Sequence, residues 1–218
     1  MVKKYKRILI MTAVEVEREA VLVGLEANNS FEVAIAGVGP ASAAARTASQ
    51  LATEDYDLVI SAGIGGGFAG KAPLESIVVA KEIIAADLGA ETGEGFSSVE
   101  ELGFGSSKIA VDSRLVEKVT KAMEGTELSV NNGSILTLST VTGTLETALQ
   151  LQARFPDAAA EAMEGFGVAT AAKDREIPIL EIRAISNPIG PRDREAWRIK
   201  EALQSLRKAC SVLPEVLT

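Results

Sequence analysis

Histidine is absent from this sequence of 218 residues. Ser-His-Asp and Cys-His triads use imidazole as their base, and the usual zinc sites use it as a ligand, so these classes of site are excluded. Acid–base chemistry in this chain therefore depends on carboxylates, lysines or tyrosines, or on polarisation by arginine and amide groups.

Cysteine and long apolar runs are also scarce. The single cysteine, Cys210, is unable to form an intrachain disulfide, which suits a reducing compartment such as the cytoplasm. No apolar run approaches the roughly 20 residues of a membrane-spanning helix. Residues 1–7 are basic, but the apolar stretch after them is short and acidic residues follow at once. We therefore expect a charged leader into a buried strand rather than a signal peptide, and a cytoplasmic protein.

Positive charge is in deficit, because 22 Lys and Arg face 30 Asp and Glu, for a net charge of −8. A polyanion would be repelled, so nucleic acid is an unfavourable partner. The net charge does not exclude a small neutral or weakly charged ligand. Hydrophobic residues make up 47% of the chain, enough for a substantial core. We expect one domain over residues 1–218, with no linker and no repeat.

Apolar runs rich in isoleucine and valine alternate with segments of helical period along the whole chain. This alternation predicts an α/β domain, built as a three-layer α/β/α sandwich with ligands gathered where strands end. The predicted strands cover residues 7–13, 31–37, 58–62, 77–85, 108–111, 134–138 and 178–186. The predicted helices cover residues 15–25, 40–52, 113–123, 144–155, 164–174 and 194–217.

Two glycine-rich segments follow predicted strands. Residues 37–39 begin like a dinucleotide-binding fingerprint, but the third glycine is missing, so a tight turn into a helix is the better interpretation. Residues 62–68 contain four glycines and no Walker pattern. They are predicted to form a turn whose backbone approaches a ligand closely, although a flexible loop is the simpler alternative.

Acidic residues stand at two strand-to-helix junctions. Glu15 and Glu17 begin the first predicted helix, where carboxylates commonly offset the helix dipole; a spacing of two lets at most one face a site. In a chain without histidine, such a carboxylate is also a natural general base. Glu164 lies at the second junction and is suited to accept hydrogen bonds from a ribose diol. Arg183 lies in an apolar run and needs a partner such as Glu17 or Glu164 if it is buried.

Taken together, these features resemble the nucleoside phosphorylase and nucleosidase superfamily, particularly methylthioadenosine/S-adenosylhomocysteine nucleosidase. The resemblance rests on residues 8–17, 37–45, 63–67, 76–87, 155–164 and 183–187. Residues 140–144 and 186–193, followed by Trp197, are similar to the futalosine hydrolase family within it. The resemblance implies a phosphorylase/hydrolase-like fold with a mixed central sheet. It also implies cleavage of the N-glycosidic bond of a purine nucleoside by water, without cofactor or metal.

Matching positions carry roles that the resemblance implies. Glu17 falls at the water-activating carboxylate, and Arg183 at the arginine that helps to hold the water. Glu164 matches the acceptor of the ribose diol, and Met163 packs beside the sugar. The backbone of residues 63–67 crowds the sugar, and residues 186–197 close over the purine, with Arg192 or Asp193 at its edge. The remaining expected substrate-binding residues are Gly65, Gly66, Thr142, Ser186, Arg192 and Asp193.

Two positions depart from the adenine-specific nucleosidases. Asn187 stands where they carry an aspartate that acts as general acid, and Ile64 stands where they usually have a serine near the water. An amide is unable to protonate a leaving base, but its NH2 group can donate to N7 or O6 of a 6-oxopurine. Because hypoxanthine leaves more readily as an anion than adenine does, Asn187 favours a 6-oxopurine nucleoside. Futalosine, the hypoxanthine nucleoside of the alternative menaquinone pathway, agrees with this reasoning.

Several alternatives stay open at this stage. A phosphorylase would need an anion site, but the Gly-Asp-Pro-x-Arg pattern is absent from the first strand-to-helix turn. An adenine-type nucleosidase is disfavoured by Asn187, and Ile64 with Asn187 also allows a purine-nucleoside-binding protein without catalysis. Relatives cap the 5′ end of the substrate with an aromatic residue of a neighbouring subunit, so Phe96 and Phe104 are candidates for that role. We therefore expect a homodimer or a larger homo-oligomer.

Overall fold

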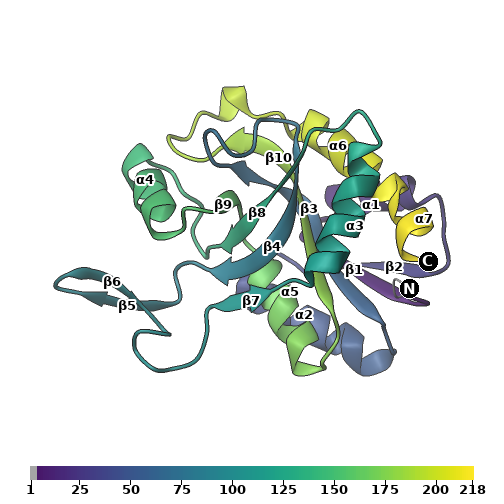
Figure 1. Cartoon of the computed structure of the whole chain (residues 1–218), viewed down its shortest axis with the longest axis horizontal. Coiled ribbons are helices and arrows are strands. Elements are labelled where there is room, and N and C mark those ends of the chain that lie inside the picture. The colour runs from purple at the N-terminus through teal and green to yellow at the C-terminus, as the bar shows by residue number, and fades with distance from the viewer. Residues whose placement is uncertain (1–3) are drawn as a thin grey trace.

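The computed structural model describes residues 4–218, so residues 1–3 of the basic leader lie outside the described part of the chain. Figure 1 shows a curved central sheet with helices around it. The first half of the chain contains β1 (Ile8–Thr12), α1 (Glu15–Leu25), β2 (Phe31–Ile35), α2 (Pro40–Thr53), β3 (Leu58–Gly67), β4 (Ile77–Ala85), β5 (Gly89–Thr92), β6 (Gly95–Ser98) and β7 (Lys108–Ala110). The second half contains α3 (Ser113–Glu124), β8 (Val130–Thr137), α4 (Leu145–Arg154), β9 (Ala158–Ala162), α5 (Gly165–Asp174), β10 (Ile179–Pro188), a 3-10 turn (Arg194–Ala196), α6 (Ile199–Ser211) and α7 (Leu213–Leu217).

The central sheet is mixed, in the order β10-β4-β8-β9-β3-β1-β2, with β7 beside β4. Strands β1, β2, β3 and β10 run parallel to one another, whereas β4 and β9 run antiparallel to the strands β10 and β3 that they meet. Because β10 also pairs with β3, the sheet curls back on itself. The long strand β3 therefore pairs with β10 along one side, and with β1 at its start and β9 at its end on the other side.

Helices cover the sheet in two groups. Helices α2 and α5 pack against each other along one side, at the bottom of Figure 1, while α1, α6, α7 and α3 form a second set of neighbours. Strand residues such as Ile8, Ile60 and Ile182 are fully buried between these groups. Runs of aliphatic residues buried on both faces are typical of such a sandwich. The predicted α/β class with a mixed central sheet is confirmed.

The glycine-rich segment is not the turn that the sequence predicted. Residues 62–67 continue strand β3, and its glycines serve close packing between strands. A β-carbon on Gly65 would lie 2.7 Å from the carbonyl oxygen of Glu161, and one on Gly67 would overlap the backbone at Ala72. Glycine in a strand interior often marks such a close approach of another backbone.

The sequence predicted a strand-to-helix junction at Glu164 but gave no bounds for the strand before it, which is β9. Its sequence, Ala-Ala-Ala-Glu-Ala, has little β-propensity, but all five residues are buried. A β-carbon on Gly133 of β8 would lie 2.7 Å from Cβ of Ala159, so the two strands admit only small residues here. Packing space, rather than propensity, explains why alanine forms this strand.

The predicted C-terminal helix over residues 194–217 is also wrong, because it is broken into three pieces. Trp197 is extended, with φ −72° and ψ 136°, so the 3-10 turn ends before α6 begins. Pro214 stands in the first turn of α7, where its missing N–H is harmless; in a helix interior it would remove a hydrogen bond. Residues 189–198 instead form a loop between β10 and α6 that contains the 3-10 turn.

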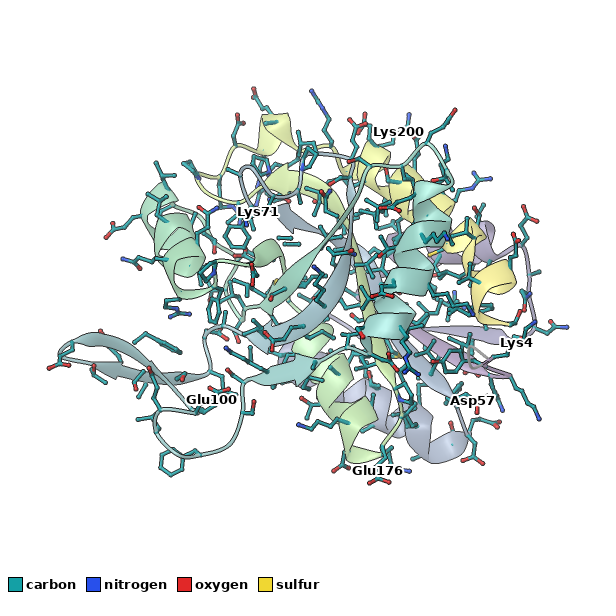
Figure 2. All side chains as sticks on the ribbon, in the orientation of Figure 1. Lys4, Asp57, Lys71, Glu100, Glu176 and Lys200 are labelled. Carbon is teal, nitrogen blue, oxygen red and sulfur yellow. The ribbon has the colours of Figure 1, made fainter. Side chains whose placement is uncertain are left out.

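Strands β5 and β6 form a hairpin that projects from the body, on the left of Figure 1. Figure 2 shows that side chains fill the body, whereas those of the hairpin extend into open space. At the opposite end, Asp57, labelled in Figure 2, accepts hydrogen bonds from the backbone N–H groups of Lys6 and Arg7. Among the described residues, no helix has the length and apolar character needed to cross a membrane.

Candidate active site

A cavity of about 270 Å³ is lined by residues of β3, β9 and β10 and by the turn that follows β1. Strand β9 runs against β3, so its C-terminal end returns toward the middle of β3 and brings Met163 and Glu164 to the same cavity as Glu17. Of the expected catalytic and substrate-binding residues, all line the cavity except Arg183, which is buried; the two candidates for the 5′ end, Phe96 and Phe104, do not line it. The expected residues that line it are Glu17, Gly65, Gly66, Thr142, Met163, Glu164, Ser186, Asn187, Arg192 and Asp193.

The side chain of Glu17 turns back toward the residues before α1. Of Glu15 and Glu17, only Glu17 faces the cavity, as the spacing of two predicted. Its Oε2 accepts hydrogen bonds from the backbone N–H of Ala13 at 2.8 Å and Val14 at 3.3 Å, and its Oε1 from Ile64 N–H at 2.8 Å. Burial raises the pKa of Glu17, although the charge of Arg183 and the bond from Ile64 oppose that shift. Glu15 instead is exposed and pairs with Arg18. Glu17 is therefore a fixed carboxylate whose affinity for a proton is increased.

Arg183 is 1% exposed and lies close to the carboxylates of Glu164 and Glu17. Its Nη1 lies 3.3 Å from Oε2 of Glu164, its Nη2 donates to Ser61 Oγ at 3.0 Å, and Nη1 also donates to the carbonyl of Ile64 at 3.4 Å. Of the two partners suggested by the sequence, Glu164 forms the ion pair, whereas Glu17 contributes through its nearby charge. These contacts hold the guanidinium at one orientation.

Gly63 marks the point where Glu17 and Arg183 approach each other. A β-carbon at this position would lie 2.6 Å from Oε1 of Glu17 and 2.7 Å from Nη1 of Arg183. Real β-carbons are not found so close to such atoms. Because Gly63 has no side chain, the side chains of Glu17 and Arg183 can both lie against β3 at this position.

Glu164 caps the start of α5 without bonding to the helix through its side chain. Its Oε1 accepts a hydrogen bond from Gly39 N–H at 3.3 Å, and its Oε2 from Met163 N–H at 3.3 Å. Gly39 has a φ of 90°, a conformation that glycine adopts easily, and it precedes Pro40 at the start of α2. The turn at residues 37–39 therefore supports this carboxylate, in agreement with its interpretation as a tight turn.

A third acid, Glu181, was missed by the sequence analysis. It is 0% exposed, and its Oε1 accepts a hydrogen bond from Arg183 Nε at 2.9 Å. Burial raises its pKa to about 7, against the effect of the Arg183 charge. A β-carbon on Gly165 would overlap this carboxyl group. Glu181 and Arg183 alternate on one strand and so share a face of the sheet, a spacing that could have indicated the pair.

Asn187 also lines the cavity, next to the last residue of β10. Its Oδ1 lies 2.9 Å from Ser186 Oγ, and its Nδ2 donates to the carbonyl of Pro188 at 3.1 Å. The Ser186 hydroxyl also lies 3.2 Å from the carbonyl oxygen of Gly65. An amide NH2 group has two donors, so one donor of Asn187 is left for a ligand.

Glu161 is a second buried acid that the sequence analysis did not single out. It lines the cavity near Thr142, and its Oε1 accepts a hydrogen bond from Thr142 N–H at 2.8 Å. Its Oε2 accepts a short hydrogen bond from the Thr142 hydroxyl. Burial raises the pKa of Glu161, and the bonds from Thr142 oppose the shift. The signal available in the sequence was a single acid within an alanine run.

The outer rim of the cavity is exposed. The guanidinium carbon of Arg192 lies 5.3 Å from the centre of the Trp197 ring, and Asp193 accepts a hydrogen bond from the N–H of Glu195. Phe96 stacks on Arg154, and Phe104 is 80% exposed; neither lines this cavity. Among residues 4–218, no group of three or more acids, cysteines or histidines is arranged to hold a metal ion.

Comparison with known proteins identifies the family of the chain. Residues 12–218 match the model of the phosphorylase superfamily. The chain belongs to the phosphorylase superfamily. It is 48% identical to a futalosine hydrolase of Streptomyces coelicolor, covering 96% of both chains, and 43% identical to one of Acidothermus cellulolyticus, covering 94% of this chain and 89% of that one. The fold also matches the solved structure of a Helicobacter pylori futalosine hydrolase with a TM-score of 0.83, at 17% identity over 96% of this chain and 98% of that one.

Proposed function

We propose that the protein hydrolyses the N-glycosidic bond of a 6-oxopurine nucleoside, with futalosine as substrate and hypoxanthine and dehypoxanthinyl futalosine as products. The observation that carries the proposal is that Glu17 and Glu164 line one cavity, with the buried Arg183 ion-paired to Glu164 and close to Glu17. The 48% identity to a futalosine hydrolase over nearly the whole chain supports the particular substrate.

At the sugar end, the C1′–N9 bond lengthens first and leaves an oxocarbenium-like centre. Glu17 takes a proton from the attacking water, whose oxygen forms the new bond to C1′, and Arg183 helps to orient that water. The raised pKa of the buried Glu17 suits a general base working near neutral pH. Glu164 accepts hydrogen bonds from the ribose diol, and Met163 packs beside the sugar.

At the base end, the electron pair of the broken bond goes to the purine, which leaves as an anion. The free donor of Asn187 stabilises that charge at N7 or O6. Oδ1 of Asn187 lies beside the Ser186 hydroxyl, so its Nδ2 rather than its oxygen is presented to the base. Arg192 and Asp193 lie on the loop that covers the purine edge.

Transfer to phosphate is the competing reaction within the superfamily. Phosphate would meet Glu17, Glu161 and Glu164 in this cavity, and like charges in one site repel. We expect equal turnover in phosphate-free and phosphate-rich buffer. A rate that depends on phosphate would identify a phosphorylase instead.

The substrate is tested by incubating the protein with futalosine, inosine and methylthioadenosine side by side and identifying the released base by chromatography. We expect hypoxanthine from futalosine as the main product. Adenine released preferentially from methylthioadenosine would identify the adenine-type nucleosidase and keep the reaction class. Calorimetric binding of inosine without release of any base would identify a binding protein instead.

The proposal extends to the setting of the reaction. We place the enzyme in the cytoplasm, where its single buried cysteine, Cys210, stays reduced, and in menaquinone biosynthesis, where futalosine is formed. We also propose a homodimer or larger homo-oligomer, in which Phe96 or Phe104 of the projecting segment reaches the cavity of a second copy. The high exposure of Phe104 and the projecting hairpin support this arrangement. Sedimentation of the protein as a monomer at working concentration would contradict it.

A further inference from the structure

Glu181 is a buried acid to which the reaction described above assigns no part. It is 0% exposed on β10 and, unlike Glu17 and Glu164, it does not line the cavity. A carboxyl group in the interior of a protein is unfavourable unless it gains partners there. Gly165 makes room for this one, because a β-carbon at that position would overlap it. The fold therefore accommodates an unfavourable side chain outside the cavity wall.

The contacts of Glu181 lead to Arg183. Its Oε1 accepts a hydrogen bond from Nε of Arg183 at 2.9 Å, and its Oε2 has no hydrogen-bond partner among residues 4–218. An apolar side chain of similar size would occupy the same space without leaving a polar atom unpaired. The bond to Nε is thus the feature of Glu181 that an apolar residue is unable to supply.

The guanidinium of Arg183 has partners on both of its edges. Nε and Nη2 lie on one edge, where Nε donates to Glu181 and Nη2 donates to Ser61 Oγ at 3.0 Å. Nη1 lies on the other edge, 3.3 Å from Oε2 of Glu164 and 3.4 Å from the carbonyl oxygen of Ile64. Because the donors of a guanidinium keep a fixed planar arrangement, holding the first edge also fixes the direction of Nη1.

The ion pair between Arg183 and Glu164 is incomplete. Arginine and a carboxylate frequently pair through two parallel hydrogen bonds, but here one contact of 3.3 Å joins them. The shorter bond to Glu181 opposes a turn of the guanidinium toward Glu164. Glu164 therefore keeps acceptor capacity for a ligand. Nη1 also stays near Glu17, since a β-carbon on Gly63 would approach both groups.

We propose that Glu181 is a positioning residue, which holds Arg183 through Nε and so keeps the guanidinium from closing onto Glu164. This inference rests on the proposed function, in which Glu164 binds the ribose diol and Arg183 orients the attacking water. Glu181 acts through Arg183 and has no contact with the substrate. Burial raises the pKa of Glu181 to about 7, and a protonated carboxyl group still accepts a hydrogen bond through its carbonyl oxygen. Both forms of the acid are therefore able to hold Arg183.

The test compares Glu181→Met with Glu181→Gln. Both side chains have nearly the size of glutamate, but only glutamine can accept the hydrogen bond from Nε. Glu181→Met should lower kcat/KM for inosine about 10- to 100-fold, because a displacement of about 1 Å in an active site can cost this much. Glu181→Gln should keep activity close to that of the wild type.

3′-Deoxyinosine provides a measurement that a general loss of structure would not change, because it lacks one hydroxyl of the diol. If Arg183 closes onto Glu164 in Glu181→Met, the preference for inosine over 3′-deoxyinosine should fall about 10-fold, the value of one hydrogen bond to a charged group. Glu181→Gln should keep the preference. Glu181→Asn, whose acceptor ends one carbon short of Nε, should behave like Glu181→Met and replaces it if that variant does not fold.

Wild-type kcat/KM in folded Glu181→Met or Glu181→Asn would overturn the inference. A loss of activity that leaves the preference between the two nucleosides unchanged would also overturn it, while base release by the wild type keeps the proposed function. If the wild type releases no base, the proposed function fails. Calorimetric binding of the two nucleosides to the same variants then still decides the role of Glu181, because an unchanged preference in binding would contradict it.

Discussion

The two ends of the cavity are built differently. At the end that we propose holds the sugar, Glu17, Glu164 and Arg183 are buried and held by backbone N–H groups and an ion pair. At the end that we propose holds the base, Arg192 and Asp193 are exposed on a loop between β10 and α6. The difference indicates that the reacting groups are positioned before the substrate arrives, because their orientation is fixed by the fold itself. We expect the exposed loop to adjust when a purine binds.

The first prediction concerns the buried end and has the largest expected effect. Glu17→Gln should lower kcat by about 10²- to 10⁴-fold, since a general base contributes rate enhancement of this size. Binding of substrate should change little, because the amide has nearly the same shape. Steady-state kinetics with futalosine, and calorimetry with a slowly reacting nucleoside, measure the two effects. Glu15→Gln, at the exposed acid two residues earlier, should keep normal turnover.

The second prediction tests whether the buried end depends on close packing at β3. Gly63→Ala should lower kcat/KM about 100-fold, because its β-carbon would displace both Glu17 and Arg183, and a shift of about 1 Å can cost this much. Gly93→Ala is the matched control, since a β-carbon there meets nothing within 4 Å. Normal activity in Gly63→Ala would mean that the pair is not held as tightly as its contacts indicate.

The third prediction uses pH to sharpen the contrast between buried and exposed acids. Glu181 has a pKa of about 7 in the folded protein, above an ordinary value of 4.5, so its protonated form is favoured by folding. Its contribution to stability is therefore complete below pH 4.5 and is lost as the pH rises through 7. Across this range the loss is at most about 3 kcal/mol, at 1.36 kcal/mol for each pKa unit.

Glu181→Gln, which imitates the protonated acid, should remove that part of the pH dependence. Urea unfolding at several pH values between 4.5 and 8 measures the free energy of unfolding in both proteins. Glu17 and Glu161 also have raised pKa values, so some decrease should persist in the variant. Parallel curves for the two proteins would show that Glu181 ionises normally.

The smallest effect is predicted at the exposed end. Arg192 stacks on Trp197, an interaction worth about 0.5–1 kcal/mol at exposed sites, so Arg192→Ala should raise KM by only about 2- to 5-fold with kcat unchanged. A large fall in kcat would show that the loop takes part in the chemical step. In that case the contrast between a fixed end and an adjustable end would no longer hold.

The sequence carried enough information for the fold class and for most of the cavity wall. Glu17 and Glu164 stand at strand-to-helix junctions. The change from a strand pattern to a helix pattern marks such a junction in the sequence, so an acid located there is easily found. Arg183 was recognisable because a guanidinium in an apolar strand needs a partner. The positions of these residues follow from local patterns that the tertiary structure keeps.

Glu181 was not recognised, because charged residues are seldom fully buried, and Glu161 was not recognised, because no strand was predicted over residues 158–162. Here both are buried, and their partners come from Thr142 and Arg183. The glycine-rich part of β3 was assigned to a turn for a related reason. Glycine is unfavourable in strands, and only the side chains that approach Gly63 from neighbouring elements explain its presence.

The central claim is that a water molecule activated at the buried end attacks the sugar carbon. Turnover of futalosine in phosphate-free water enriched in oxygen-18, followed by mass spectrometry of the sugar product, tests it most directly. We predict release of hypoxanthine and one heavy oxygen in the dehypoxanthinyl product, with the label absent when Glu17→Gln is used over the same time. Release that requires phosphate, or a sugar product without the label, would contradict the account.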